Sequence, residues 1–294
     1  MPHTRRKIPP SQQNKRLQVT DSSGWTHVTT NGNARRLHRS AKNTQTQENE
    51  KAEAELETAI EPLLPAEAPN RTTLADLERQ LQLYRQRWEE STSWRSVEEG
   101  LRRGLHSLLP LATSRRNDGT NEETEDAGSI SIVCIGLGSP SGFLRGGWVD
   151  RRAVSMYQLA ALSSVVTWIE THLPSSTPSL ALKGYAQDPV FNKHDISLLA
   201  SLNITVLEHP SAFAKISPRT LLFCPGAEIK HLAILLMHNP AMVFGGPLGD
   251  INSDVVRAWL KERESVALGK FEELEAAFWG MSIYYPSKYG DGEG

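Results

Sequence analysis

The stretch from Ser129 to Gly138, SISIVCIGLG, constrains the fold more than any other part of the chain. A short β-branched apolar run that leads directly into closely spaced glycines is typical of a buried parallel strand with a sharp turn at its carboxyl end. A helix-forming run follows from about Ala153. In α/β proteins, ligands bind at the carboxyl ends of such strands. The stretch therefore predicts an α/β architecture and also the place at which to look for a site.

Short apolar runs and helical runs alternate after this first strand. Five strands are predicted, at Ile130–Ile135, Leu180–Tyr185, Ile204–Leu207, Thr220–Cys224 and Ala241–Phe244. Helices are expected over residues 153–172, 193–202, 228–237 and 253–268. This alternation favours a doubly wound, mainly parallel, Rossmann-like sheet with helices on both faces. Right-handed crossovers predict the spatial order 3-2-1-4-5, which puts the first and fourth strands side by side at the switch point.

The chain ahead of this sheet divides into three segments. Apolar residues three or four apart, from Leu74 to Leu108, predict two amphipathic helices or one kinked helix packed on the main domain. The run from Thr113 to Gly128 is polar and acidic, as in a linker. The expected division is a disordered tail (1–71), a helical extension (72–112), an acidic linker (113–128) and an α/β domain (129–290).

The charge of the tail is uneven. Residues 1–42 hold nine Lys or Arg against Asp21 alone, whereas residues 48–70 hold seven acids against Lys51. Neither segment has a sustained apolar period, so both are expected to be disordered. The basic arm is either a solvated tail or a nuclear-import or nucleic-acid contact. Because aromatic interleaving is limited to Trp25, we expect protein partners rather than nucleic acid.

Cysteine content and hydropathy bear on the compartment. The two cysteines, Cys134 and Cys224, both fall in predicted buried strands, which indicates a reducing compartment with neither a disulfide framework nor a zinc cluster. The first residues are polar and charged, and no apolar run approaches membrane-spanning length. We expect a protein of the cytoplasm, the nucleus or both, with no membrane partner and no metal site.

The glycine loop after the first strand is the candidate binding site. Backbone amides at Gly138 and Ser139, next to Gly136, could face an anion or an adenosine, and Asp188 is placed as a ribose-binding acid would be. These four residues are the candidate contacts for a nucleotide-like small molecule, whose identity stays open. The alternative is that the glycines serve packing and that Asp188, which precedes a proline, makes a turn. Gly142 comes one residue late for a G-x-G-x-x-G pattern.

No complete catalytic constellation can be read from the sequence, so catalytic residues stay unassigned. His194 and His231 have no second His or Cys at metal-ligand spacing, which favours surface or capping roles. Cys224 is interpreted as a small buried hydrophobe. The run from Gly245 to Asp250, GGPLGD, either closes the same cleft or is a loop.

Several segments, in order, resemble one family. They are IGLGS at 135–139, QLA at 158–160, DPVF at 188–191, HDISLLASLNITVL at 194–207, TLLFCP at 220–225, Asn239, and AAFWGMSIYYP at 276–286. Their order and spacing resemble the sensitivity-to-red-light-reduced (SRR-like) family over roughly Ser129 to Pro286. SGWTHV at 23–28 resembles a Trp-Thr-x-Val element that many members carry ahead of the domain.

The resemblance implies a regulatory, non-catalytic protein. The family is named from a plant protein of light signalling and the circadian clock. Animal members are linked to haem biosynthesis and clock function, and a yeast member to microtubule-related processes. Where the family usually has His-Cys after the fourth-strand proline, this chain has Gly226-Ala227, which removes a candidate histidine. The alternative is an S-adenosylmethionine- or nucleotide-binding enzyme, methyltransferase-like, that uses the strand-end glycine cleft.

Overall fold

The computed structural model describes residues 17–20, 26–29, 64–109, 129–144, 150–174 and 181–287. The chain divides into two compact units, residues 1–62 and 63–294. In the first unit, strand β1 (Leu17–Thr20) pairs antiparallel with β2 (Thr26–Thr29), which contains most of the Trp-Thr-x-Val element. The rest of the expected disordered tail, up to residue 63, and the linker at 113–128 lie outside the described residues.

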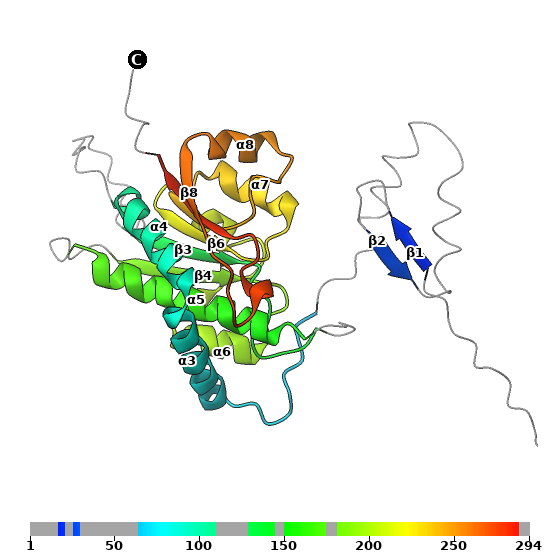
Figure 1. The fold of residues 1–294 in the computed structure, drawn as a ribbon. Helices are drawn as coiled ribbons and strands as arrows, with labels where there is room; N and C mark the ends of the chain where they lie inside the picture. Colours follow the sequence, from blue (N-terminus) through cyan, green and yellow to red (C-terminus); the bar gives the residue numbers. More distant parts are fainter. Residues whose placement is uncertain are drawn as a thin grey trace, which may run out of the picture. The chain divides into compact units, whose positions relative to one another are not determined.

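The second unit is built on a seven-stranded sheet with the order β5-β4-β3-β6-β7-β9-β8 (Figure 1). Its strands are β3 (Ile130–Ile135), β4 (Leu182–Gln187), β5 (Ile204–Val206), β6 (Thr220–Cys224), β7 (Met242–Gly245), β8 (Arg263–Ala267) and β9 (Ser282–Pro286). The five strands from β5 to β7 are parallel. They occur in the predicted 3-2-1-4-5 order, with β3 and β6 adjacent, so the predicted α/β fold and its topology are confirmed.

The far end of the sheet differs from the prediction. Helix α8 covers only Asp254–Leu260, and the second half of the helix expected over 253–268 is strand β8. β8 pairs antiparallel with β9, and β9 pairs antiparallel with β7. The sequence of β8, RESVA, has no continuous apolar run, because it is an edge strand whose Glu264 and Ser265 are exposed. Its strand conformation comes from pairing with β9, a tertiary effect that overrides local propensity.

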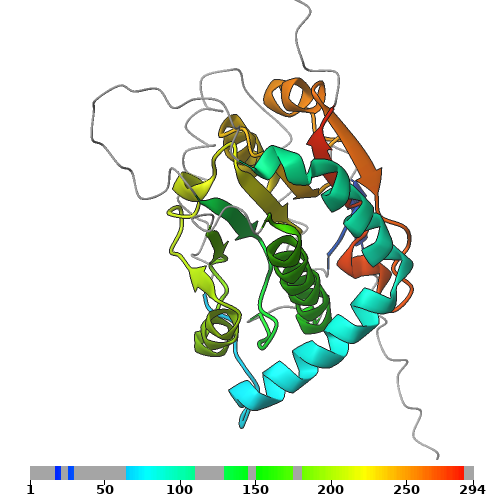
Figure 2. The same ribbon diagram turned by 90° about the vertical axis from the view of Figure 1, so that its left-hand side faces the viewer.

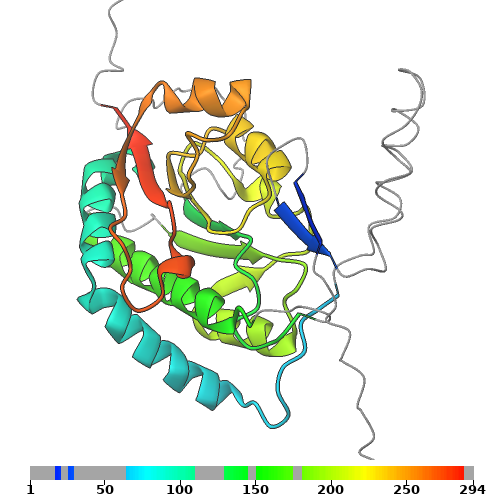
Figure 3. The same cartoon turned by 45° about the vertical axis from the view of Figure 1, so that its right-hand side comes forward.

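Alternate side chains of each central strand enter two separate cores. In β3, Ile132 belongs to one core and Val133 to the other, as the two-residue period of a strand requires. The first core is covered by α3 (Leu74–Glu90), α4 (Thr92–Leu108), α5 (Arg152–His172) and α6 (Lys193–Ser201). The second is covered by α7 (Ile229–Met237) and α8. Figure 3 shows these two groups of helices on opposite sides of the sheet, so the sheet is doubly wound.

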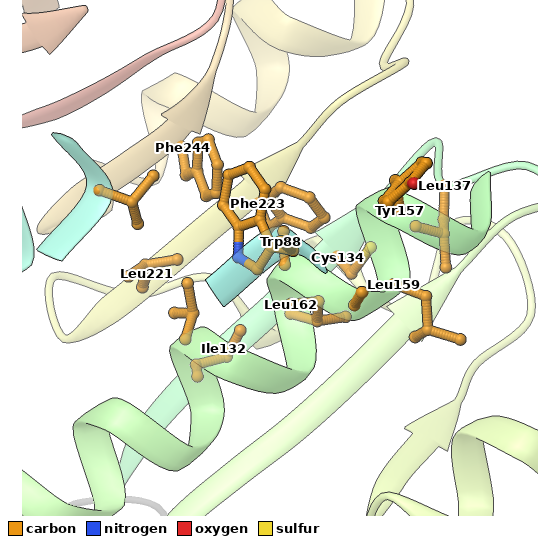
Figure 4. Close-up of a cluster of buried hydrophobic side chains, with 14 of the residues drawn as sticks. Trp88, Ile132, Cys134, Leu137, Tyr157, Leu159, Leu162, Leu221, Phe223 and Phe244 are labelled. Carbon is orange, nitrogen blue, oxygen red and sulfur yellow. The ribbon is translucent and has the colours of Figure 1, made fainter. Parts of the chain in front are cut away.

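Helices α3 and α4 follow one another along the chain (Figure 2). Ser91 ends the first and caps the second by accepting a hydrogen bond from the Trp94 amide. Their apolar stripe faces the core. Trp88 is fully buried, with its ring centroid 4.4 Å from that of Phe278 and 5.6 Å from that of Phe271. Figure 4 shows Trp88 among side chains from β3, α5, β6 and β7.

Residues 64–71 fall within the segment that the sequence assigned to the tail, yet they pack on the sheet unit. Ala66 is buried, and its amide donates to the Val190 carbonyl at 2.8 Å. Glu67 and Phe143 exchange two backbone hydrogen bonds, each 2.8 Å long. This bridge ties residues 64–71 to the loop that follows β3. The packed part of the chain therefore begins upstream of the expected boundary at residue 72.

Candidate functional site

A cavity of about 550 Å³ lies at the carboxyl ends of β3, β4 and β6. The four residues that the sequence singled out, Gly136, Gly138, Ser139 and Asp188, all line it. The remaining walls come from the start of α5, the segment after β5 and the connection from β6 to α7. The structure thus brings the predicted residues together at the predicted edge of the sheet, which is where ligands enter doubly wound folds.

Two glycines let the loops after β3 and β6 touch through their backbones. Gly136 has φ +78°, and a Cβ there would lie 2.5 Å from the carbonyl carbon of Gly226. In turn, a Cβ at position 226 would lie 2.5 Å from the Gly136 carbonyl oxygen. No side chain fits either position without moving a loop. A histidine at position 226 would therefore need a different loop path here.

Asp188 ties the β3 loop to the turn that follows β4. Its Oδ2 accepts a hydrogen bond from the Gly138 amide at 2.7 Å, and its Oδ1 accepts one from the Val190 amide at 3.0 Å. Burial raises the pKa of the Asp188 carboxyl above its ordinary value, although the two amides act in the opposite direction. The Gly138 amide, which the sequence suggested for an anion, is thus already bonded to a carboxylate.

A second carboxylate, Asp195, fixes the rest of the glycine loop. Its side chain is fully buried and accepts three hydrogen bonds, from the Ser139 hydroxyl at 2.6 Å, the Ser141 amide at 3.0 Å and the Asn192 amide at 3.0 Å. The bond from Asn192 is half of a capping box that begins α6. Sequence reasoning did not select Asp195. The N-x-x-D spacing from Asn192 to Asp195 was the signal that could have found it.

Five further polar side chains that the sequence did not connect also line the cavity. They are Gln187, His209, Glu228, Lys230 and His231. The ring centroids of His209 and His231 are 5.4 Å apart, and Lys230 Nζ lies 2.9 Å from Glu228 Oε2. Burial lowers the pKa of His231. The sequence favoured a surface or capping role for His231. The structure adds that His231 lines the cavity, where the loop after β5 places His209 beside it.

The other candidates do not contribute to the cavity. Burial raises the pKa of the Cys224 thiol to about 12, which fits the interpretation of this residue as a small hydrophobe rather than a nucleophile. The run from Gly245 to Asp250 does not line the cavity, and within it the Leu248 amide donates to the Tyr284 hydroxyl at 3.2 Å. His194 likewise lies outside the cavity lining, in the first turn of α6.

Metal-binding clusters and membrane-spanning helices are both absent from the described ranges. Among these residues, no group of three or more His, Cys, Asp or Glu side chains is arranged to hold a metal ion. None of the helices in the same ranges combines the length and the apolar character needed to cross a membrane.

Comparison with known proteins gives one match. Residues 101–285 match the family described as the SRR1 domain, which is more than half of the 294 residues. No curated protein and no solved structure matches the chain. The matched range contains the seven-stranded sheet apart from Pro286, the last residue of β9, and it contains every residue that lines the cavity.

Proposed function

We propose that this chain, which belongs to the SRR1 domain family, is a regulatory protein whose strand-end cavity binds a nucleotide-like small molecule. The family resemblance supports a role in light, circadian or related cellular regulation. Protein partners follow from a regulatory role, and the cytoplasm or the nucleus is the expected location. Imaging of a fluorescent fusion would test the location, and a purely extracellular signal would contradict it.

The observation that carries the binding part of the proposal is the cavity itself. Its volume of about 550 Å³ is within the range of about 300–1,000 Å³ that is usual for small-molecule sites. It lies at the carboxyl edge of the sheet beside the β3–β6 switch point, where doubly wound folds bind nucleotides. Leu137 and Val154 give it apolar surface on which a base could pack, and polar groups also line it.

The enzyme alternative uses the same cavity. His209 and His231 lie against it, and imidazole is the side chain that most often transfers protons near neutral pH. A methyltransferase-like enzyme would bind S-adenosylmethionine and convert it to S-adenosylhomocysteine in the presence of an acceptor. A regulatory protein would bind its ligand and release it unchanged. Mass spectrometry of the ligand recovered after incubation with cell extract separates the two.

The test of binding is a thermal-shift screen of the full chain with S-adenosylmethionine, S-adenosylhomocysteine, NAD and ATP. A ligand at one hundred times its dissociation constant stabilises the folded state by about 2.7 kcal/mol. At least one of these ligands is expected to raise the melting temperature.

A pair of matched variants assigns the effect to the cavity. Ala227 lines the cavity, so Ala227→Phe should fill part of it and remove the ligand-dependent shift. Ala200 is exposed on α6 outside the cavity, so Ala200→Phe should retain the shift. The proposal fails if no adenosine-containing ligand stabilises the wild-type chain, or if the shift is equal in the two variants.

A further inference from the structure

We propose that Gln187 orients His209 as a hydrogen-bond donor into the strand-end cavity, and that this donor recognises an anionic oxygen group of the ligand, a phosphate or a carboxylate. The inference rests on the proposed function in one respect, namely that the ligand occupies this cavity. It does not depend on the rest of the ligand being an adenosine.

The orientation begins with Gln187, the last residue of β4, whose side chain is buried. The fully buried Ala212 amide donates a hydrogen bond to Gln187 Oε1 at 3.0 Å. A backbone N–H can only donate, so the side-chain oxygen must face Ala212 and the side-chain nitrogen must face the other way. The two ends of the Gln187 amide are therefore assigned by their partners.

The nitrogen end of this amide determines the tautomer of His209. Gln187 Nε2 lies 3.0 Å from His209 Nδ1. Because an amide nitrogen only donates, His209 Nδ1 must accept, and the proton of the neutral ring resides on Nε2. The ring is also held edge-on against Phe213, at a centroid distance of 5.4 Å and an angle of 88°. Within the described ranges, no protein group accepts from His209 Nε2.

The other charged groups that line the cavity favour an acceptor with negative charge. Arg151 and Lys230 both line the cavity and can only donate hydrogen bonds. The carboxylates nearby are already engaged: Glu228 pairs with Lys230 at 2.9 Å, and Asp188 accepts from two amides. Arg151 forms no ion pair among the residues that the structure describes. A donor on neutral His209 together with the Arg151 guanidinium suits an anionic oxygen group.

The binding test compares ligands that differ in the anionic group only. Titration calorimetry on the full chain uses ATP against adenosine, S-adenosylmethionine against decarboxylated S-adenosylmethionine, and inorganic phosphate alone. The member of each pair that carries phosphate or carboxylate should bind at least about tenfold more tightly. The pair with the larger ratio identifies which of the two anions the site takes.

Variants of His209 separate the donor from the rest of the side chain. In His209→Asn the amide oxygen keeps an acceptor near the Nδ1 position, but the Nε2 donor is lost, so anionic ligands should bind about tenfold more weakly. Affinity for adenosine should not change. In His209→Gln the longer amide restores a donor near the Nε2 position, so much of the affinity should return. His238→Asn, an exposed histidine after α7 that does not line the cavity, is the matched control.

The positioning role of Gln187 has its own readout. The ¹⁵N NMR shifts of His209 should show a protonated Nε2 and an unprotonated Nδ1 in the wild-type chain, and a mixture of tautomers in Gln187→Met.

Equal affinity for the two members of each pair, or an Nδ1–H tautomer in the wild type, would overturn the inference. Adenosine binding that Ala227→Phe abolishes would then leave the proposed function standing. Binding of inorganic phosphate that depends on His209, without any binding of adenosine ligands, would support the inference and overturn the nucleotide proposal. If neither phosphate nor any adenosine compound binds, both are overturned.

Discussion

The two walls of the cavity differ in what their polar groups contact. In the glycine wall, formed by residues 136–139, 142 and 188–190, the Gly138 amide donates to Asp188 and the Ser139 hydroxyl donates to Asp195, which does not itself line the cavity. In the histidine wall, formed by Gln187, His209, Glu228, Lys230 and His231, one imidazole donor points to no protein acceptor among the described residues. The glycines and Asp188, which the sequence pattern identified, hold the loop after β3 in place. His209, which the sequence pattern did not identify, is better able to contact a ligand.

The largest effect should come from Asp195, because three donors depend on its carboxylate. Asp195→Ala should lower the free energy of unfolding by about 4 kcal/mol, measured by urea denaturation, because it leaves buried donors without acceptors. Asp195→Asn keeps one oxygen acceptor and should cost less. A loss below about 1 kcal/mol in the alanine variant would show that the glycine wall is not held by this carboxylate.

The contact between the loops after β3 and β6 should give the next largest effect. Gly136→Ala combines a positive φ with a Cβ placed 2.5 Å from Gly226, so we expect a loss of about 3 kcal/mol. Gly249→Ala is the control, because a Cβ there has nothing within 4 Å. Equal melting temperatures for the two variants would mean that the loops separate at little cost.

Asp188→Ala should have an intermediate effect and tests the tether directly. The change leaves the amides of Gly138 and Val190 without their acceptor, and we expect a loss of about 2 kcal/mol in the free energy of unfolding. Asp250→Ala, in an exposed turn, is the control and should be nearly neutral. If Asp188→Ala weakens ligand binding without changing stability, the carboxylate is a ligand contact rather than a tether.

The smallest effect should be a difference in pH dependence between the walls. Burial lowers the pKa of His231 below 6.5, so its contribution to stability is complete above that pH and is lost as the pH falls through the folded pKa. Asp188 has the opposite sign: its pKa is raised, so its contribution is complete below 3.8 and is lost as the pH rises through the folded pKa. Urea midpoints in a pH series should fall less steeply below pH 6.5 in His231→Gln than in the wild type. Parallel curves would contradict this expectation.

The sequence predicted the parallel half of the sheet because each of its strands is a local signal. β3 and β6 are mostly apolar and are buried along their whole length. β8 carries no such signal, since its conformation depends on β9, which lies fifteen or more residues further along the chain. The second strand was placed two residues early, at 180–185 rather than 182–187. As a result, Gln187 was read as loop and not as the end of a strand.

One half of the site, the glycine wall, could be predicted from the sequence, and the other half could not. The glycines and Asp188 follow strands that the pattern identifies, so their convergence at one edge follows from the topology. The approach of His209 to Gln187 depends on the path of the loop after β5. No periodicity in the sequence encodes that path, and only the tertiary structure shows which nitrogen of the imidazole accepts.

The burial of Trp88 shows that the residues packed in one core extend beyond the residues that match the family. The family match begins at residue 101, inside α4, whereas Trp88 lies in α3 and is fully buried against Phe271 and Phe278 near the carboxyl end of the chain. A chain trimmed to the matched residues would keep both phenylalanines and lose the indole that packs against each of them. The packed unit is therefore longer than the segment that matches the family, and helix α3 belongs to its hydrophobic core.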